Sequence, residues 1–208
     1  MNSDPENLVI VQRRHYGRLV GAAIVLVGLA AIVHAFVVGQ IEWSYVGRFL
    51  TVRAIMEGLA NTIVMSILAM LLGLVLGVVF AIMRLSANPV LSTTALGYIW
   101  FFRAIPVLLQ LLLWYNLALV FPTIGIPGVA SWKTVDVMTP FVAALLGLGI
   151  QQGAFTAEVV RAGLLSVDQG QYEAAQTLGM TRLQLLRRII MPQAMRVIVP
   201  PVGNEFIG

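Results

Sequence analysis

The sequence predicts an all-α protein, a polytopic membrane helical bundle, and three observations carry that prediction. Hydrophobic residues make up 59% of the 208 residues and charged residues only 11%, against about 25% charged in soluble domains. Long apolar runs recur, each able to cross ~30 Å of hydrocarbon at 1.5 Å per residue. The arginines collect between these runs. This is too little charge for the surface of a water-soluble globular protein. We therefore expect lipid around most of the chain.

The chain opens with a polar tail, residues 1–18, which contains Arg13, Arg14 and Arg18. An apolar run covers residues 19–39. A signal peptide also joins basic residues to an apolar core, but that core is usually about 7–15 residues long. We therefore interpret 19–39 as a first transmembrane helix.

Further spans and polar connectors follow. Residues 40–58 carry Trp43 and are expected to lie along the outer membrane surface. Gly73 and Gly77, a GxxxG pair, predict close approach of a neighbouring helix. Arg103 interrupts the third span and, because a central arginine costs roughly 2.5 kcal/mol or more, should lie at the membrane edge or face the protein interior. The expected spans are 59–83, 95–121 and 138–160, with connectors at 84–94 and 121–137 and a further span opening at 197.

Residues 168–194, which we call the elbow, form the longest polar segment after the N-terminus. They predict two short helices joined by a tight turn. Asp168 is the expected N-cap of the first helix, paired with Gln171 in a capping-box-like arrangement. Leu178 is expected to end that helix, with Gly179 in the left-handed conformation that follows many helices.

The second helix of the elbow is expected to begin with a capping box between Thr181 and Gln184. Pro192 is expected to end it, because proline lacks an amide donor and disfavours helix in the preceding residue. The apolar side chains are expected on one face: Leu183, Leu186, Ile189 and Ile190. From the pattern alone, a basic amphipathic helix of this kind is typical of an interfacial membrane anchor.

The placement of basic residues predicts the topology. With the N-terminus in the cytoplasm, only Arg48, Arg53 and Lys133 fall outside, which satisfies the positive-inside rule. The elbow then lies on the cytoplasmic side. The arginines expected in the cytoplasm are Arg13, Arg14, Arg18, Arg84, Arg161, Arg182, Arg187, Arg188 and Arg196. They are segregated by topology and form no patch with aromatic residues, so a nucleic-acid partner is not expected.

The elbow resembles the EAA loop of permease subunits in ATP-binding-cassette importers. The matching positions are Glu173, Ala174, Ala175, Gly179, Ile190 and Pro192. Flanking motifs resemble the polar amino acid uptake subfamily: Glu158 to Gly163, Gly170-Gln171, Pro192 to Ala194, Pro200-Pro201, Asn204, Gly58 to Thr62, and Tyr98 to Gln110. The resemblance covers about Trp43 to the end of the sequence. Ala104 departs from it, since the family usually carries glycine there.

The resemblance implies a fold and a set of partners. Residues 40–208 would be an importer permease domain, preceded by an extra helix at 19–39, in a bacterial cytoplasmic (inner) membrane. Partners would be the ATPase subunits, a second permease copy or a paralogue, and an extracytoplasmic solute-binding receptor. Family members continue through further spans, so we expect Gly208 to mark a fragment or a truncated chain. Contact with the ATPase would fall to Glu173, Ala174, Ala175, Leu178, Gly179 and Met180.

Polar residues at membrane depth are the candidates for the solute path, because such groups are costly in lipid. They are Asn61, Thr62, Gln110, Asn116, Gln151, Gln152 and Glu158. Interhelical hydrogen bonding, worth about 0.6 kcal/mol on average, is the structural alternative for each amide. Glu158 is the strongest candidate, since it carries charge. It could meet a substrate ammonium group, or pair with Arg161 or Arg103.

The sequence lacks the motifs of several enzyme classes. The only lysine is Lys133, preceded by Trp132, so no GxxxxGK[ST] phosphate loop exists, and ATP hydrolysis is expected on a partner. No cofactor is expected, and the absence of cysteine excludes disulfides and thiolate metal sites. Two alternatives remain open: a channel or scaffold without an ATPase, and the same importer architecture for an opine or compatible solute.

Overall fold

The computed structural model describes residues 16–126, 128 and 130–207, and most of them are helical. Most of the predicted tail, 1–18, lies outside the described residues, as do Pro127 and Gly208. Three described helices are long and apolar enough to span a membrane, or four if a bent pair counts as one span. The chain divides into two compact units, residues 1–56 and 57–208. The all-α membrane class is thus confirmed.

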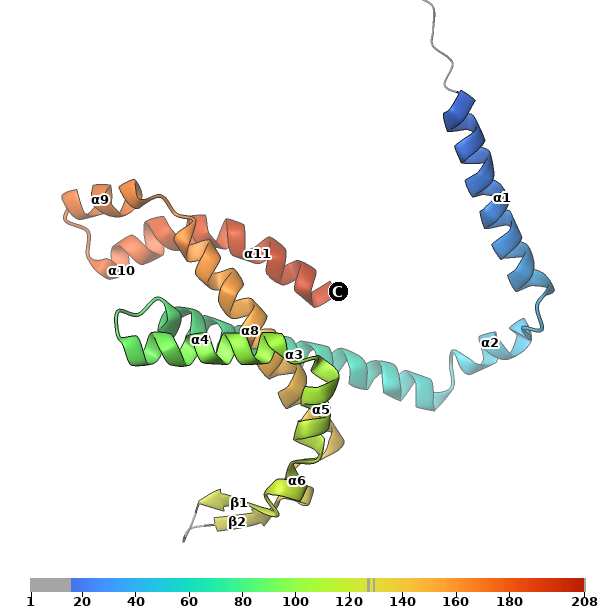
Figure 1. Ribbon diagram of the computed structural model, residues 1–208, viewed down its shortest axis with the longest axis horizontal. Coiled ribbons are helices and arrows are strands. Elements are labelled where there is room, and N and C mark those ends of the chain that lie inside the picture. Colours follow the sequence, from blue (N-terminus) through green and yellow to red (C-terminus); the bar gives the residue numbers. More distant parts are fainter. Residues whose placement is uncertain (1–15, 127, 129, 208) are drawn as a thin grey trace, which may run out of the picture. The chain divides into compact units, whose positions relative to one another are not determined.

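The first unit contains the predicted first span. Helix α1 (Tyr16–Val38) is apolar along its length, and all its residues are exposed. A short helix, α2 (Trp43–Phe49), follows it in the predicted connector. Helix α3 (Arg53–Arg84) begins earlier than the expected residue 59, so α2 and the start of α3 together make 13 of the 19 residues of the predicted connector helical. Figure 1 labels these elements along the blue and cyan part of the chain.

In the second unit, helix α4 (Pro89–Ala104) also begins earlier than expected. The Asn88 side chain accepts a 2.9 Å hydrogen bond from the Val90 amide, and Pro89 occupies the first helical position, where its missing amide costs nothing. Helix α5 (Val107–Tyr115) follows at a bend of 102°. The predicted interruption near Arg103 is therefore a sharp corner, visible in Figure 1.

The connector predicted at 121–137 contains more structure than expected. A short helix, α6 (Leu117–Val120), leads into an antiparallel hairpin of β1 (Thr123–Ile126) and β2 (Ala130–Lys133), in which Thr123 pairs with Lys133. Helix α7 (Thr134–Val137) closes the segment, and the Thr134 hydroxyl donates to the Phe121 carbonyl. That buried bond ties the two ends of the segment together.

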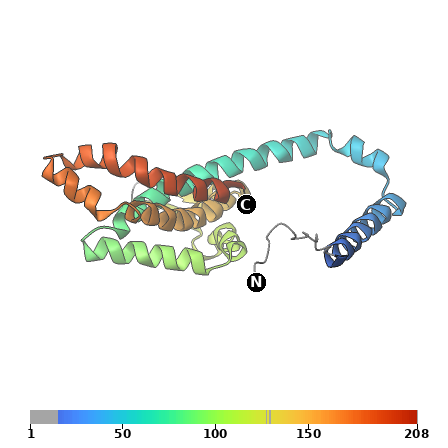
Figure 2. The ribbon, with the colours of Figure 1, turned by 90° about the horizontal axis from the view of Figure 1, so that it is seen from above.

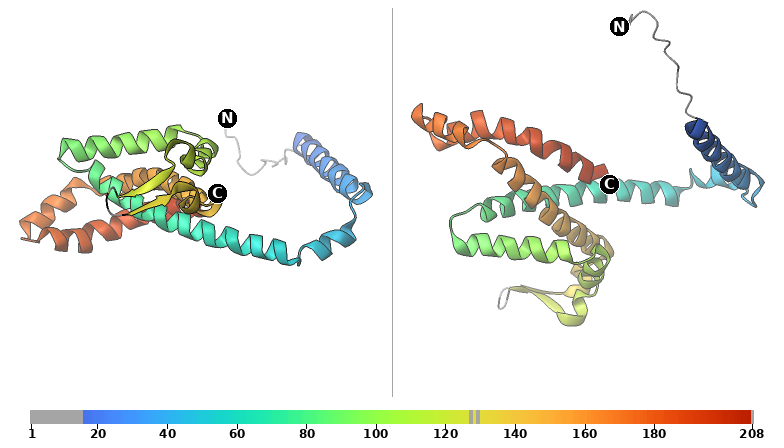
Figure 3. Two further views of the ribbon diagram at one scale, coloured as in Figure 1. Left: turned by 90° about the horizontal axis from the view of Figure 1, so that it is seen from below. Right: turned by 45° about the horizontal axis from the view of Figure 1, so that its top comes forward.

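Helix α8 (Pro140–Leu165) is the central element of the second unit. Gly73 and Gly77 of α3 pack against it: a Cβ added at either would lie 2.6 Å from side-chain carbons of Gln152 or Thr156. The predicted close approach is confirmed. Helix α4 also contacts α8, since the Tyr98 hydroxyl donates a 2.6 Å hydrogen bond to the Ile150 carbonyl. Figure 2 and the left view of Figure 3 show α8 between neighbouring helices.

The chain then returns through the elbow. Helix α9 (Gln169–Thr177), helix α10 (Arg182–Leu185), a π-helical turn η2 (Leu186–Ile190) and helix α11 (Met191–Ile207) follow one another. The right view of Figure 3 shows α9 and the α10–α11 helix side by side as the orange and red hairpin. The buried core beneath the elbow joins α3, α8 and α11 through Ala81, Val160, Val167, Ile190, Ala194 and Ile198.

The prediction that Pro192 ends the second elbow helix is wrong. Helix continues from Arg182 to Ile207, through Pro192, Pro200 and Pro201. The π-helical turn directly before Pro192 supplies the reason, since such local widening lets a membrane helix accommodate proline. The span expected from residue 197 thus begins inside a helix that continues from the elbow, without a break. The wider turn also shifts the apolar face: Leu183 and Leu186 are exposed, while Leu185, Ile189 and Ile190 pack inward.

Candidate functional site: the elbow and the intramembrane clefts

The turn of the elbow has the predicted local geometry. Asp168 is the N-cap of α9 as predicted, and its side chain accepts a 2.7 Å hydrogen bond from the Gly170 amide. The predicted capping-box-like pair with Gln171 is wrong, because Gln171 donates only its backbone amide, to the Asp168 carbonyl. Gly179 adopts φ +68°. Its amide donates to the Gln176 carbonyl and the Met180 amide donates to the Ala175 carbonyl. These two bonds make a Schellman motif, which satisfies carbonyls that the helix end would leave unpaired.

The second elbow helix opens on the predicted capping box. The Gln184 amide donates to the Thr181 hydroxyl at 3.3 Å, and the Thr181 amide donates to the Gln184 side-chain oxygen at 2.9 Å. Both sides of the turn are therefore closed by local hydrogen bonds. The turn is held in one shape by groups within about a dozen residues.

The six residues expected to contact an ATPase differ in accessibility. Leu178 is 78% exposed, and Glu173, Ala174 and Gly179 are also exposed. Met180 is half-buried. Ala175 is fully buried, so it supports the turn from beneath and offers no surface. The turn thus exposes one large apolar side chain, Leu178, and the helix before it exposes one carboxylate, Glu173.

Glu158 lies in a groove of about 590 Å³ between α4 and α8. Of the two partners considered for it, the structure selects Arg161, which donates two bonds to one carboxylate oxygen at 2.8 and 3.2 Å and one to the other at 3.3 Å. Arg103 lies in the same groove with its guanidinium carbon 5.1 Å from the centre of the Phe155 ring. Arg84 also lines the groove and donates to the Ser92 hydroxyl at 2.8 Å.

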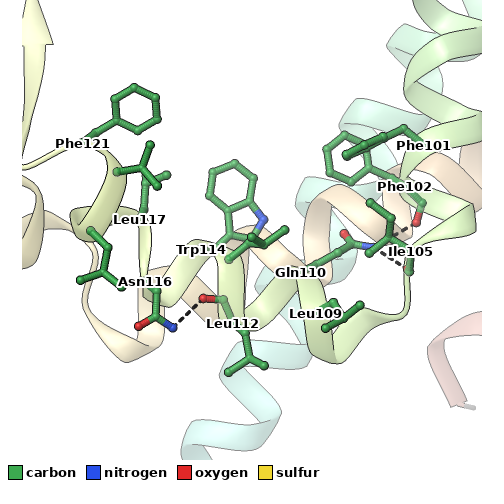
Figure 4. Close-up of a pocket in the computed structure, with 13 residues that line it drawn as sticks. Phe101, Phe102, Ile105, Leu109, Gln110, Leu112, Trp114, Asn116, Leu117 and Phe121 are labelled. Atoms are coloured by element: carbon green, nitrogen blue, oxygen red, sulfur yellow. Dashed lines mark hydrogen bonds between the residues drawn. The ribbon is translucent and has the colours of Figure 1, made fainter.

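Gln110 and Asn116 line a different cavity, of about 810 Å³, whose other walls are apolar (Figure 4). The Gln110 side chain is 2% exposed and donates at 3.0 Å to the carbonyls of Phe102 and Ile105, which the bend between α4 and α5 leaves free. Asn116 donates at 2.8 Å to the Leu112 carbonyl. Both amides therefore satisfy local backbone, although the Gln110 side-chain oxygen is buried without a partner among the described residues.

The remaining path candidates are spread along α3 and α8. Asn61 and Thr62 are exposed on α3, and the Thr62 hydroxyl donates to the Gly58 carbonyl one turn earlier. Gln151 and Gln152 are half-buried and line a cleft of about 430 Å³. The structure does not gather the predicted path residues into one site. It distributes them over three separate cavities and the α3 surface.

Glu205 is the functional candidate that sequence reasoning missed. Its carboxylate lies in the cleft of Gln151 and Gln152, where the Gln152 side chain donates to it at 2.6 Å and the Thr156 hydroxyl at 3.5 Å. The available signal was a single acidic residue in the proline-containing segment at the end of the sequence. Its partners lie 53 and 49 positions earlier, so spacing alone could not connect them.

Comparison with known proteins places this architecture in a family. Residues 73–208 match the family described as "Binding-protein-dependent transport system inner membrane component". Similar proteins include the arginine transport system permease protein ArgU of Corynebacterium glutamicum (38% identical; 99% of this chain, 66% of the relative). The nopaline transport system permease protein NocM of Agrobacterium fabrum is 34% identical, over 73% of this chain and 61% of that protein. The chain thus spans about two thirds, or less, of the length of these relatives.

Solved structures agree with the sequence relatives. The chain is similar to a crystal structure of an amino acid ABC transporter with histidines, with a TM-score of 0.66 and 34% identity over 81% of this chain and 72% of that one. It is also similar to the MetNI methionine ABC transporter in an inward-facing conformation, with a TM-score of 0.54 and 27% identity over 76% and 69%. By its sequence and its fold, the chain belongs to the family of binding-protein-dependent transport system inner membrane components.

Proposed function

We propose that this chain is a permease subunit of an ATP-driven, receptor-dependent importer of polar amino acids. The observation that carries the proposal is the elbow: a rigid turn, closed by a Schellman motif and a capping box, that exposes Glu173, Ala174 and Leu178. A membrane anchor needs no such turn. A docking element does, because it must keep its shape while a partner moves it.

In this mechanism the subunit itself performs no hydrolysis. The elbow seats in a groove on an ATPase subunit, and ATP-driven closure of the ATPases moves it as a rigid body. The core beneath the elbow, which joins α3, α8 and α11, passes that displacement to the spans. The pore alternates between outward-open and inward-open states only if ATP and the loaded receptor each favour one state.

The remaining parts of the proposal follow from this role. The pore is formed by two copies, or by this chain and a paralogue, in a bacterial inner membrane. Positive-inside placement of arginines puts the N-terminus and the elbow in the cytoplasm. Residues 40–208 form the permease domain and 19–39 an extra helix, in keeping with α1 being exposed along its length. Relatives named for arginine and nopaline transport leave both amino acids and opines as candidate solutes.

Affinity capture tests the proposal. The tagged full-length permease is purified from mild detergent, and co-purifying proteins are identified for the wild type, Glu173→Arg and Gly179→Val. We expect an ATPase with the wild type and its loss in both variants. Glu42→Arg is the matched control, since Glu42 is exposed at the start of α2 in the other unit, and should retain the ATPase.

Two results would overturn the proposal. A folded, oligomeric wild type that recovers no ATPase would favour the channel or scaffold. Recovery of the ATPase by both elbow variants at the wild-type level would remove the elbow from the coupling mechanism.

A further inference from the structure

The groove between α4 and α8 collects more positive than negative charge. Arg84, Arg103 and Arg161 line it, and Glu158 is the one acidic residue among its described walls. Arg161 holds that carboxylate through three hydrogen bonds, the shortest of 2.8 Å. Arg84 donates to a hydroxyl and Arg103 lies over an aromatic ring. Within 16–126, 128 and 130–207, no carboxylate forms an ion pair with either of them, so two positive charges in the groove are uncompensated.

This excess charge lies at one end of the membrane spans. Arg84 is the last residue of α3, and Arg161 lies about one turn before the end of α8. The proposed orientation puts this end in the cytoplasm. Arg103 belongs to the last turn of α4, and its guanidinium carbon is 5.1 Å from the centre of the Phe155 ring in the same groove. A positive charge within a span is costly in lipid unless an anion or water meets it.

The other walls of the groove are apolar, and several of them are exposed. Leu96 and Trp100, which line it together with the arginines, are 47% and 70% exposed. On a membrane-spanning chain, large exposed apolar side chains of this kind mark a contact with lipid or with another subunit. The groove has room, about 590 Å³, for a phosphate group and the first part of an acyl chain.

We propose that this groove binds an anionic phospholipid of the cytoplasmic leaflet, with Arg84 and Arg103 on its phosphate. Guanidinium groups match phosphate oxygens through paired, charge-assisted hydrogen bonds. Basic pockets between helices at this face of a membrane are typical of anionic-lipid sites. A soluble phosphate would satisfy the arginines but leave Leu96 and Trp100 uncovered, whereas acyl chains would cover them. The two uncompensated charges favour an anionic lipid over a zwitterionic one.

Fluorescence quenching by brominated lipids tests the inference, because Trp100 lines the groove. The full-length permease, with Trp100 as its only tryptophan, is placed in phosphatidylcholine nanodiscs that contain a small, equal fraction of brominated phosphatidylglycerol or brominated phosphatidylcholine. We expect the anionic lipid to quench Trp100 at least about fivefold more strongly, the factor that one basic residue near a membrane surface supplies. Arg84→Gln/Arg103→Gln should lower this preference below about twofold, since it removes both uncompensated charges.

Controls separate a bound lipid from general surface charge. Arg103→Lys keeps the charge and should retain the preference. Arg182→Gln removes an exposed arginine of α10 that does not line the groove, and should change nothing. Soluble glycerol phosphate should not relieve the quenching, because it brings no acyl chain.

Equal quenching of the wild type by both lipids would overturn the inference, and this comparison needs no charge variant that could misfold. A loss of preference with Arg182→Gln as large as with the double variant would also overturn it, by pointing to diffuse surface charge. Relief of quenching by glycerol phosphate would assign the groove to a free anion. Dissociation of permease oligomers by the double variant, without a lipid preference in the wild type, would assign the arginines to a second subunit. The assay involves no ATPase and no transport, so its failure would leave the proposed importer function standing.

Discussion

Substitution of Gly179 tests whether the backbone conformation of the elbow turn matters for binding the ATPase, without changing side-chain contacts inside the permease. Gly179 has φ +68°, and a Cβ added there would meet nothing within 4 Å. The cost of a side chain is therefore conformational strain alone. For an ordinary L-residue in the left-handed region that cost is about 1–2 kcal/mol. Asparagine tolerates the region better than alanine, and a β-branched residue tolerates it worst.

The strain converts directly into a loss of affinity for the ATPase. If the elbow binds only with its turn intact, the apparent dissociation constant rises in proportion to the fall in the competent population. A cost of about 1–2 kcal/mol lowers the ratio of intact to altered turn by a factor of roughly 5–30, which is the largest loss of affinity that the strain can cause. We expect affinity to fall in the order glycine, asparagine, alanine, valine, measured by titrating purified ATPase onto the full-length permease in nanodiscs.

Gly97 provides the matched control. It lies exposed in helix α4, has no atom within 4 Å of an added Cβ, and has a negative φ. Gly97→Ala should therefore leave the affinity unchanged. Equal affinity across the Gly179 series would refute the reasoning. So would a loss as large for asparagine as for valine, because that would point to a steric contact with the partner and not to strain in the turn.

Three further substitutions test the packing, the cap and the ion pair. Gly77→Leu should destabilise the bundle by about 1–3 kcal/mol through overpacking against Thr156, read as a lower thermal midpoint in detergent, whereas Gly58→Leu on the same helix, with open space around it, should not. Thr181→Ala should cost about 1 kcal/mol of local stability and speed amide exchange in the turn that follows; unchanged exchange would contradict the capping box. Glu158→Gln should change solute affinity or preference more than complex assembly, because its partly exposed ion pair contributes about 1 kcal/mol or less; loss of the folded protein would make its role structural.

Local signals in the sequence were sufficient to predict the spans and the turn of the elbow. Apolar runs long enough to cross a bilayer predict helices whatever packs around them, because lipid leaves the backbone no other partner. The ends of the elbow helices depend only on groups a few residues apart. The N-caps Asp168 and Thr181 and the left-handed Gly179 could therefore be predicted from the sequence. The family motifs added the prediction that the elbow is the loop that contacts the ATPase.

Only the tertiary structure decided the features that depend on residues far apart in the sequence or on competing local preferences. Proline at 192 predicts a helix end from local rules, but the π-helical turn before it and the buried Ile190, Ala194 and Ile198 keep the helix continuous. The sequence predicts Gln110 as a path residue, and only the structure shows that the sharp bend brings its amide to the carbonyls of Phe102 and Ile105. Glu205 becomes a candidate site residue only in the folded structure, where α11 packs on α8 and the Gln152 side chain donates to its carboxylate. The local sequence carries no information about this pairing, because Gln152 and Glu205 are far apart in the sequence and only the packing of the two helices brings them together.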